Sequence, residues 1–336
     1  MWRLIQKIKA RVHHTIRPVL ETARRVSKSK IDFVFIFFDI IYCRFRFHFN
    51  CDEYLKYSLY NLKNRYRKNY ITCYHQRHDY SKINTKDFTR SKFAFYQRMP
   101  DLFQRDMILI PSCGAEAFLS FAKKHQEFII KPDKGSWGRG IQKFKYVNDE
   151  QTLNFFMRAT EGTLVCEEYI HQHSALETLN PFCVNTLRIV SLLLEDDVEI
   201  LSAVLKVGGN PNVIVDNMHQ GGIGAQVDVV HGLTTTYGYD YKFNVFTHHP
   251  LTGVQIIGFQ VPNWEHVIAL IKRGHKRISQ CKLLGWDVAI TQDGVELVEV
   301  NNAPGPLLMQ TMDGVPKGEK LLQIFKEGNS YKEEIL

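Results

Sequence analysis

The sequence predicts an α+β protein in which a basic helical region precedes two lobes built largely from strands. Residues 1–82 mix aromatic residues with Arg and Lys at irregular helical spacing, which predicts several helices. Beyond residue 127, apolar alternation and turn residues predict three hairpins, at residues 135–140, 196–197 and 293–294. With 336 residues, 44% of them hydrophobic, the chain can bury a large core, so we expect a globular protein of two or three structural units.

Positive charge is concentrated in the N-terminal part of the chain. Residues 1–100 hold 22 Lys and Arg against 7 Asp and Glu, whereas the remaining residues hold 21 against 28. A basic region of this kind favours an anionic partner: a membrane surface, a phosphorylated sugar carrier or, least expected, nucleic acid. A basic helical face that meets only water is an equally open interpretation.

The cysteines and the N-terminus indicate an intracellular protein. The seven cysteines show no paired metal-type spacing and mostly lie in apolar runs, which favours a reduced, cytoplasmic compartment. The chain begins with basic amphipathic sequence, so we expect no secretory signal. The apolar stretch 31–43 contains two acids and is shorter than the roughly 20 residues that span a bilayer. We expect a buried or interfacial helix there, with peripheral contact at the inner membrane surface left open.

A glycine-rich loop between two strands is the first candidate for nucleotide binding. In FIIKPDKGSWGRGI, Lys131 ends an apolar strand and is followed by Gly135, Ser136, Gly138 and Gly140 before a second strand begins. Glycines let backbone N–H groups approach phosphate oxygens, and the lysine adds a positive charge beside them. A Rossmann or Walker loop would lead into a helix, so those two folds are disfavoured. A simple turn is the alternative interpretation of this segment taken alone.

Acidic residues face each other in the last predicted hairpin. In GWDVAITQDGVELVEVNNAPG, a turn about Asp293 places Asp287 opposite Glu299, with Asn301 on the same face. Two opposed carboxylates repel unless a cation lies between them, and Mg²⁺ prefers oxygen ligands of these kinds. The sequence therefore predicts a magnesium site, although acids that merely face water would give the same pattern.

Cationic residues face each other in the middle hairpin. A turn centred on Asp197 sets Arg188 across from Lys206. An anion between them would relieve the repulsion, and a transferred phosphate suits this role. A slip of the register by one residue would place the two side chains on opposite faces.

The order of these motifs resembles ATP-grasp enzymes, and most of all the sugar-transfer-associated ATP-grasp family. The motifs that carry the resemblance are the Lys-Pro and glycine loop, Glu167 to Ile170, Asn185 to Arg188, Asp216-Asn217 with Gly221-Gly222, and Asp287, Glu299 and Asn301. The similarity covers nearly the whole chain after residue 30, where DIIYCRFRFHFNCDEYLKYSLYNL looks like the family's helical lead-in. It implies a fold in which two α+β lobes clasp ATP, with residues 83–170 as linker and small ATP-binding lobe and residues 171–336 as large catalytic lobe.

The resemblance also implies a role for each motif. It assigns the glycine loop, Lys131 and an upstream lysine, Lys92, to the phosphates of ATP, and the metal set to Mg²⁺. The expected adenine-site residues are Glu167, Glu168, Tyr169 and Ile170. The expected substrate-side residues are Asn185, Asp216, Asn217, Gly221 and Gly222. Arg188 and Lys206 are the expected catalytic cations, and at position 206 the family leads us to expect an arginine, whose planar bidentate donor a lysine lacks.

The function that follows is an Mg-ATP-dependent ligase. We expect γ-phosphoryl transfer to a carboxylate, attack of an amine or other nucleophile on the acyl phosphate, and, by resemblance alone, a role in making or modifying a surface polysaccharide. A carboxylate-bearing or sugar-linked molecule would be the substrate. A kinase of a sugar or lipid carrier, or a non-catalytic ATP-regulated protein that binds through its basic N-terminal region, are the alternatives.

Overall fold

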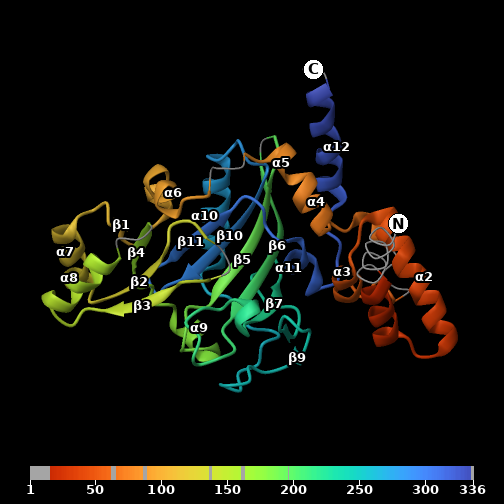
Figure 1. The fold of residues 1–336 in the computed structure, drawn as a ribbon, viewed down its shortest axis with the longest axis horizontal. Helices are drawn as coiled ribbons and strands as arrows, with labels where there is room; N and C mark the ends of the chain where they lie inside the picture. The colour runs from red at the N-terminus through yellow and green to blue at the C-terminus, as the bar shows by residue number, and fades with distance from the viewer. Residues whose placement is uncertain are drawn as a thin grey trace, which may run out of the picture. The chain divides into compact units, whose positions relative to one another are not determined.

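Two compact units make up the structure. The computed structural model describes residues 16–61, 66–85, 89–135, 138–159, 163–195 and 197–333. One unit comprises Met1–Lys82 and Gly305–Leu336, and the other comprises Ile83–Pro304 (Figure 1). The C-terminal 32 residues therefore group with the N-terminal helices, while both sheets of the described chain lie in the second unit.

The first unit is helical. Its elements are a helix over residues 16–26, α2 (Lys30–Phe47), α3 (Cys51–Lys56), η1 (Arg67–Asn69), α4 (Cys73–His78), α5 (Tyr80–Ile83), which runs one residue into the second unit, α11 (Pro306–Thr311) and α12 (Glu319–Glu333). Ser29 caps α2 by accepting a hydrogen bond from the Asp32 amide, and Asn50 caps α3 with Glu53 in a capping box. Within the described residues, no helix is both long enough and apolar enough to cross a membrane.

A small antiparallel sheet forms one end of the second unit. Its strand order is β1 (Met107–Ile110), β4 (Leu164–Glu168), β2 (Glu127–Pro132) and β3 (Gln142–Lys145). Helices α7 (Ala115–His125) and α8 (Asp149–Arg158) pack on it through a cluster that includes Phe118, Phe128 and Phe156 (Figure 1). The pairing of Phe128 with Phe144 confirms the predicted hairpin around the glycine loop.

A larger antiparallel sheet carries most of the core. Its order is β11 (Val295–Asn301), β10 (Leu283–Ile290), β5 (Thr186–Leu193), β6 (Val198–Val207), β7 (Ile223–Val227), β8 (Gly238–Tyr239) and β9 (Val245–Phe246). Alternate residues of the central strands, such as Leu187, Ile189 and Trp286, pack with α10 (Trp264–Lys276) on one face. Because side chains alternate along a strand, the charged residues of the same strands lie on the other face.

The structure contains both of the other predicted hairpins. The predicted strand register is correct in one of them and wrong in the other. Asp287 pairs with Glu299, as expected. The predicted opposition of Arg188 and Lys206 is wrong: Lys206 pairs with Thr186, and Arg188 with Val204. The Leu194 amide donates to the Asp197 carbonyl and closes the turn, so the turn lies earlier in the chain than expected. A bulge at Val190/Ser191 corrects only part of the resulting difference in register. The remaining offset of two residues leaves both cations on one face.

A buried histidine links the core strands to α10. Trp286 Nε1 donates to Ser191 Oγ at 2.7 Å, Ser191 Oγ lies 2.7 Å from His275 Nδ1, and His275 Nε2 lies 2.9 Å from the Cys281 carbonyl. The carbonyl can only accept, so Nε2 carries the proton and Nδ1 accepts from the serine hydroxyl. Burial lowers the pKa of His275 to about 4. The folded protein therefore holds this imidazole neutral.

We expect this histidine to destabilise the protein in mild acid. In the unfolded chain His275 titrates near its ordinary pKa of about 6.5, so its contribution to stability is complete above that pH and is lost as the pH falls toward 4. The full loss is about 3 kcal/mol. Thermal unfolding followed from neutral to acid pH should show a shallower loss of Tm in His275→Asn, whereas the exposed-site variant His266→Asn should follow wild type. Equal pH profiles for all three proteins would contradict the assignment.

Candidate active site

Four charged groups form a chain of contacts on the charged face of the large sheet. Arg188 on β5 lies beside Asp287 on β10, with Nε 2.7 Å from Oδ1 and Nη2 2.8 Å from Oδ2. Lys206 Nζ on β6 lies 3.3 Å from Oδ1 of Asp287 and 3.3 Å from Oδ1 of Asp216. The Asp216 carboxylate in turn accepts from the amide and hydroxyl of Thr186, at 2.8 and 2.5 Å. The anion between Arg188 and Lys206 is therefore a protein carboxylate, that of Asp287.

These contacts set the protonation of the cluster. Burial opposes ionisation of Asp287, but the charges of Arg188 and Lys206 outweigh it and hold the pKa of Asp287 well below its usual value. Burial would lower the pKa of Lys206, yet Asp216 and Asp287 raise it above its ordinary value. Asp287 and Lys206 are thus both charged at neutral pH.

The predicted magnesium residues lie next to this cluster. Glu299, on β11, is half-buried and stands opposite Asp287. Asn301 is two residues further along the same strand, and its Oδ1 accepts from the Ala303 amide at 2.8 Å. Two ionisable carboxylates and an amide oxygen on neighbouring strands are oxygen ligands of the kind Mg²⁺ takes, so the donor set fits this ion.

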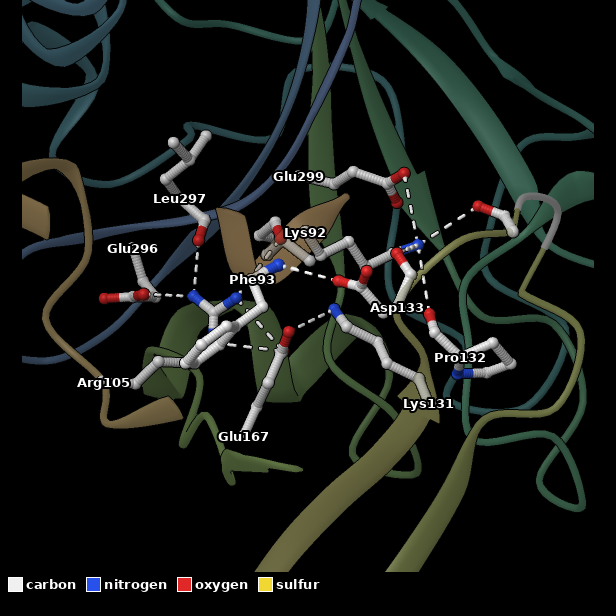
Figure 2. A network of polar contacts seen from close by, with 12 residues as sticks. Lys92, Phe93, Arg105, Lys131, Pro132, Asp133, Glu167, Glu296, Leu297 and Glu299 are labelled. Carbon is white, nitrogen blue, oxygen red and sulfur yellow. Dashed lines mark hydrogen bonds and ion pairs between the residues drawn. The ribbon is translucent and has the colours of Figure 1, made fainter. Parts of the chain in front are cut away.

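Two lysines from different elements, Lys131 and Lys92, reach the same network of polar contacts (Figure 2). Lys131, at the end of β2, is buried with its Nζ 2.7 Å from Oε1 of Glu167 on β4. Lys92 begins α6 (Lys92–Arg98), and its Nζ lies 3.1 Å from the Gly135 carbonyl and 4.0 Å from Oε1 of Glu299. Burial lowers the pKa of Lys92, and the nearby Glu299 works against that shift. The sequence-predicted residues Lys92, Lys131, Glu167 and Glu299 are therefore brought together.

The glycine loop is tied to the start of α6. Asp133 Oδ1 accepts from the Phe93 amide at 2.9 Å and from the Ser91 hydroxyl at 3.0 Å. Gly138 and Gly140 have φ angles of 68° and 75°, which favour glycine. Ser136, also predicted to contact phosphate, lies outside the described residues. The loop that would meet phosphate is thus anchored on the helix that carries Lys92.

The predicted adenine-site residues occupy β4 and the segment that follows it. Glu168 is bonded to Asp106, the residue before β1: its amide donates to the Asp106 carbonyl at 3.0 Å, and its Oε2 accepts from the Asp106 amide at 3.1 Å. Lys143 Nζ lies over the ring of Tyr169, 4.0 Å from its centroid. Ile170 follows directly, and its side chain is partly buried. Glu167 is the member of this group that contacts a lysine, Lys131, and the adenine assignment of all four residues remains a prediction.

The predicted substrate-side residues fall into two places. Asn185 is fully buried, and its amide donates to Gln172 Oε1 and to two backbone carbonyls while its Oδ1 accepts from the Gly208 amide at 3.1 Å. It fixes the loop after β6. Asp216, Asn217, Gly221 and Gly222 form a tight loop around η3 (Met218–Gln220), and a Cβ on Gly222 would lie 2.2 Å from the Asp216 carbonyl oxygen. Glycine is thus required where this loop holds Asp216 against Lys206.

Sequence reasoning missed Arg105, which joins the two sheets (Figure 2). Its Nε and Nη2 donate to Oε2 of Glu167 at 3.2 and 3.1 Å, and its Nη1 pairs with Glu296 and with the Leu297 carbonyl on β11. All three charged side chains are buried. An arginine in a short loop carries no spacing signal, but an acid within the apolar run VELVEV could have indicated a buried partner for Glu296.

The two acids respond differently to this arginine. Burial favours the neutral form of Glu167, but Arg105 and Lys131 outweigh it, so its pKa is lowered. For Glu296 burial outweighs Arg105, and its pKa is raised. Glu167 is held between two cations, which explains why it remains ionised.

Comparison with protein families identifies the fold. A family described as sugar-transfer associated ATP-grasp matches residues 65–324. The chain belongs to the sugar-transfer associated ATP-grasp family. The predicted ATP-grasp fold, with two antiparallel sheets and a helical N-terminal region, is confirmed. A comparison with curated protein sequences finds no match.

Several solved structures are similar to this ATP-grasp chain at low identity. D-alanyl-alanine synthetase A from Vibrio cholerae has 13% identity and a TM-score of 0.44, over 72% of this chain and 65% of that protein. D-alanine–D-alanine ligase from Bacillus anthracis has 14% identity and a TM-score of 0.44, over 74% and 70%. The ATP-grasp ligase PsnB, complexed with a precursor peptide and AMPPNP, has 12% identity and a TM-score of 0.42, over 72% and 58%. The chain thus spans less than two thirds of the Vibrio protein's length.

We expect Arg105 to be required for stability. Removing one partner from a buried ion pair leaves an uncompensated charge, so Arg105→Met should cost about 3–5 kcal/mol. The matched control is Arg277→Met, because Arg277 makes a solvent-exposed pair with Asp101 that should contribute little to stability. Denaturant unfolding of both variants measures the difference. Equal losses in the two would show that the Arg105 network does not hold the sheets.

Proposed function

We propose that this ATP-grasp protein is an Mg-ATP-dependent ligase that activates a carboxylate as an acyl phosphate. The observation that carries the proposal is the single face that holds Arg188, Lys206, Asp287 and Glu299, with Lys92 close to Glu299. An array of alternating cations and carboxylates suits a phosphate chain bound through a divalent ion. Among the described residues of this face we find no nucleophile set beside a base, which agrees with chemistry based on positioning and charge.

Each group has a proposed role in this reaction. Asp287, Glu299 and Asn301 would hold the magnesium ion, which when bound neutralises phosphate charge and orients the triphosphate. Lys92, Lys131 and the glycine loop would bind phosphate oxygens, and Glu167 to Ile170 would line the adenine site. Arg188 and Lys206 would stabilise the charge that spreads over the γ-phosphoryl oxygens during transfer.

The proposed reaction has two steps. A carboxylate oxygen of the substrate attacks the γ-phosphorus, the bond to the bridging oxygen breaks, and ADP leaves. An amine or other nucleophile then attacks the acyl carbon, and inorganic phosphate leaves with one oxygen of the original carboxylate. The tight loop from Asp216 to Gly222 would border the acceptor. The family description supports a sugar-linked acceptor, and we propose a role in surface polysaccharide formation or modification.

We expect ATP binding that depends on magnesium and on Glu299. Glu299→Gln keeps the shape of the side chain but removes the charge that a divalent ion needs, so the affinity for Mg-ATP should fall about tenfold or more. Isothermal titration of ATP with and without magnesium measures this, with Glu265→Gln on the exposed start of α10 as the matched control. An affinity that is unchanged in Glu299→Gln would remove Glu299 from the metal set, and absence of ATP binding in wild type would overturn the proposal.

Oxygen transfer distinguishes a ligase from a kinase. With a carboxylate acceptor labelled with ¹⁸O and a suitable nucleophile, the released phosphate should carry one label, because it departs with a carboxylate oxygen. A stable phosphorylated product without free phosphate would support the kinase alternative instead.

Arg188→Met should lower kcat by about 10²-fold or more, since it removes a donor to the transferred group. Acceptors are screened by ADP release, with Lys272→Gln as a surface control.

A further inference from the structure

Helix α2 has two apolar faces, and only one of them packs against the protein. Ile36, Ile40 and Cys43 are buried in the core of the first unit. The opposite side of the helix exposes large apolar residues: Ile31 (72%), Val34 (50%), Phe35 (71%), Phe38 (63%), Tyr42 (53%) and Phe45 (79%). We call these six residues the aromatic face of α2. A continuous exposed apolar face of this kind ordinarily marks an interaction site, so this face calls for a partner.

The aromatic face forms one continuous stripe. At 100° per residue its six members fall within an arc of about 100°, and the centre of this arc lies roughly opposite the buried residues. Four of its members are separated by three or four positions in the order 31, 35, 38, 42, and 45 follows three positions later. Such spacing places neighbouring side chains in contact along the helix. The stripe runs from the first turn of α2 to its last.

Positive charge borders the stripe on both sides. On the same helical projection, Lys30 and Arg46 lie just beyond its two edges, and both are exposed. The two acids of α2 are partly buried and each accepts hydrogen bonds from other groups of the protein. Asp32 Oδ2 accepts from the Lys28 amide at 2.7 Å, and Asp39 is held by Arg67 and by the Tyr54 hydroxyl at 2.7 Å. The outward charge next to the aromatic face is therefore basic.

We propose that the aromatic face of α2 docks on an anionic lipid bilayer, with its rings in the interfacial region and Lys30 and Arg46 among the headgroups. Aromatic residues with lysine or arginine beside them are the composition of helices that lie in a membrane interface. The helix carries too many charged residues to cross the bilayer, in keeping with the finding for the described helices as a whole. A second copy of this chain fits less well, because a symmetric contact would set the flanking cations of both copies near each other. This inference is independent of the proposed ligase chemistry.

Flotation of the full chain with lipid vesicles tests the proposal. The protein should bind vesicles of phosphatidylcholine that contain phosphatidylglycerol. Its affinity for vesicles of pure phosphatidylcholine should be lower by about tenfold or more. Phe35→Ser/Phe45→Ser should reduce binding to the anionic vesicles about tenfold or more, because it removes the two most exposed rings. The matched apolar control is Met157→Ser/Val230→Ser, which changes exposed residues of the second unit and should leave binding unchanged.

The charge requirement has its own pair of variants. Lys30→Gln/Arg46→Gln should bind less tightly and lose most of the salt dependence of binding, whereas Lys242→Gln/Lys276→Gln, at exposed positions elsewhere, should resemble wild type. All variants should keep the wild-type Tm, since the altered side chains are exposed. Unchanged vesicle binding in both α2 variants would overturn the proposal. So would a wild-type dimer that Phe35→Ser/Phe45→Ser makes monomeric, with no binding of wild type to either vesicle.

Discussion

The buried guanidinium of Arg105 is the interaction on which the arrangement of the candidate site depends. It contacts Glu167 on β4 of the small sheet and Glu296 on β11 of the large sheet. Desolvation of three charges is costly and is offset only when donors and acceptors are well matched. Arg105 meets this condition by donating to both carboxylates and to the Leu297 and Val298 carbonyls. The strand that carries Glu299 is thereby fixed relative to the strand whose Glu167 holds Lys131.

The cations of the candidate site are already paired with protein carboxylates. Arg188 and Lys206 already share Asp287, and Lys131 already pairs with Glu167, so none of these cations has an uncompensated charge. On the proposed function, Asp287 would hold a divalent ion, and a carboxylate engaged in this way would hold Arg188 and Lys206 less firmly. The two cations would then be available to phosphate oxygens. Metal and triphosphate would therefore bind cooperatively, because each relieves a charge that the other leaves unmatched.

The two charged hairpins show what the sequence can and cannot predict. Alternation and turn residues locate both hairpins and assign their faces, because these depend on local composition. Register depends on how the turn closes and on bulges. In the acidic hairpin, the pairs near the turn are one residue away from the expected symmetry, and the bulge at Asp287/Val288 restores the pairing of Asp287 with Glu299. In the cationic hairpin the turn is further from its expected place, and the bulge at Val190/Ser191 leaves an error of two residues. The pairing of Asp287 with Glu299 was therefore predicted correctly in part because of a bulge that the sequence pattern does not predict.

Contacts between side chains of distant segments are harder to predict than the face of a sheet on which a residue lies. Arg105 lies 62 residues from Glu167 and 191 from Glu296, and neither separation has a period that marks a contact. The family resemblance assigned residues to the proposed nucleotide site, but it gave no indication of Arg105. The fold class, and the faces on which most charged residues of the candidate site lie, were accessible from the sequence because these residues lie on regular strands or in a glycine-rich loop. The supporting network was not, because it is a property of the tertiary fold.

Lys206 joins two acids that lie on different segments. The resemblance led us to expect an arginine at this position, whereas the lysine places a compact ammonium 3.3 Å from carboxylate oxygens of both Asp216 and Asp287. A planar guanidinium donates best to one carboxylate in its own plane, but an ammonium has three donors that can reach acids in different directions. Lys206 can therefore couple the loop that begins at Asp216 to a carboxylate of the proposed metal set. A change of charge at Asp287 would then be felt at the loop that borders the acceptor, through a single side chain.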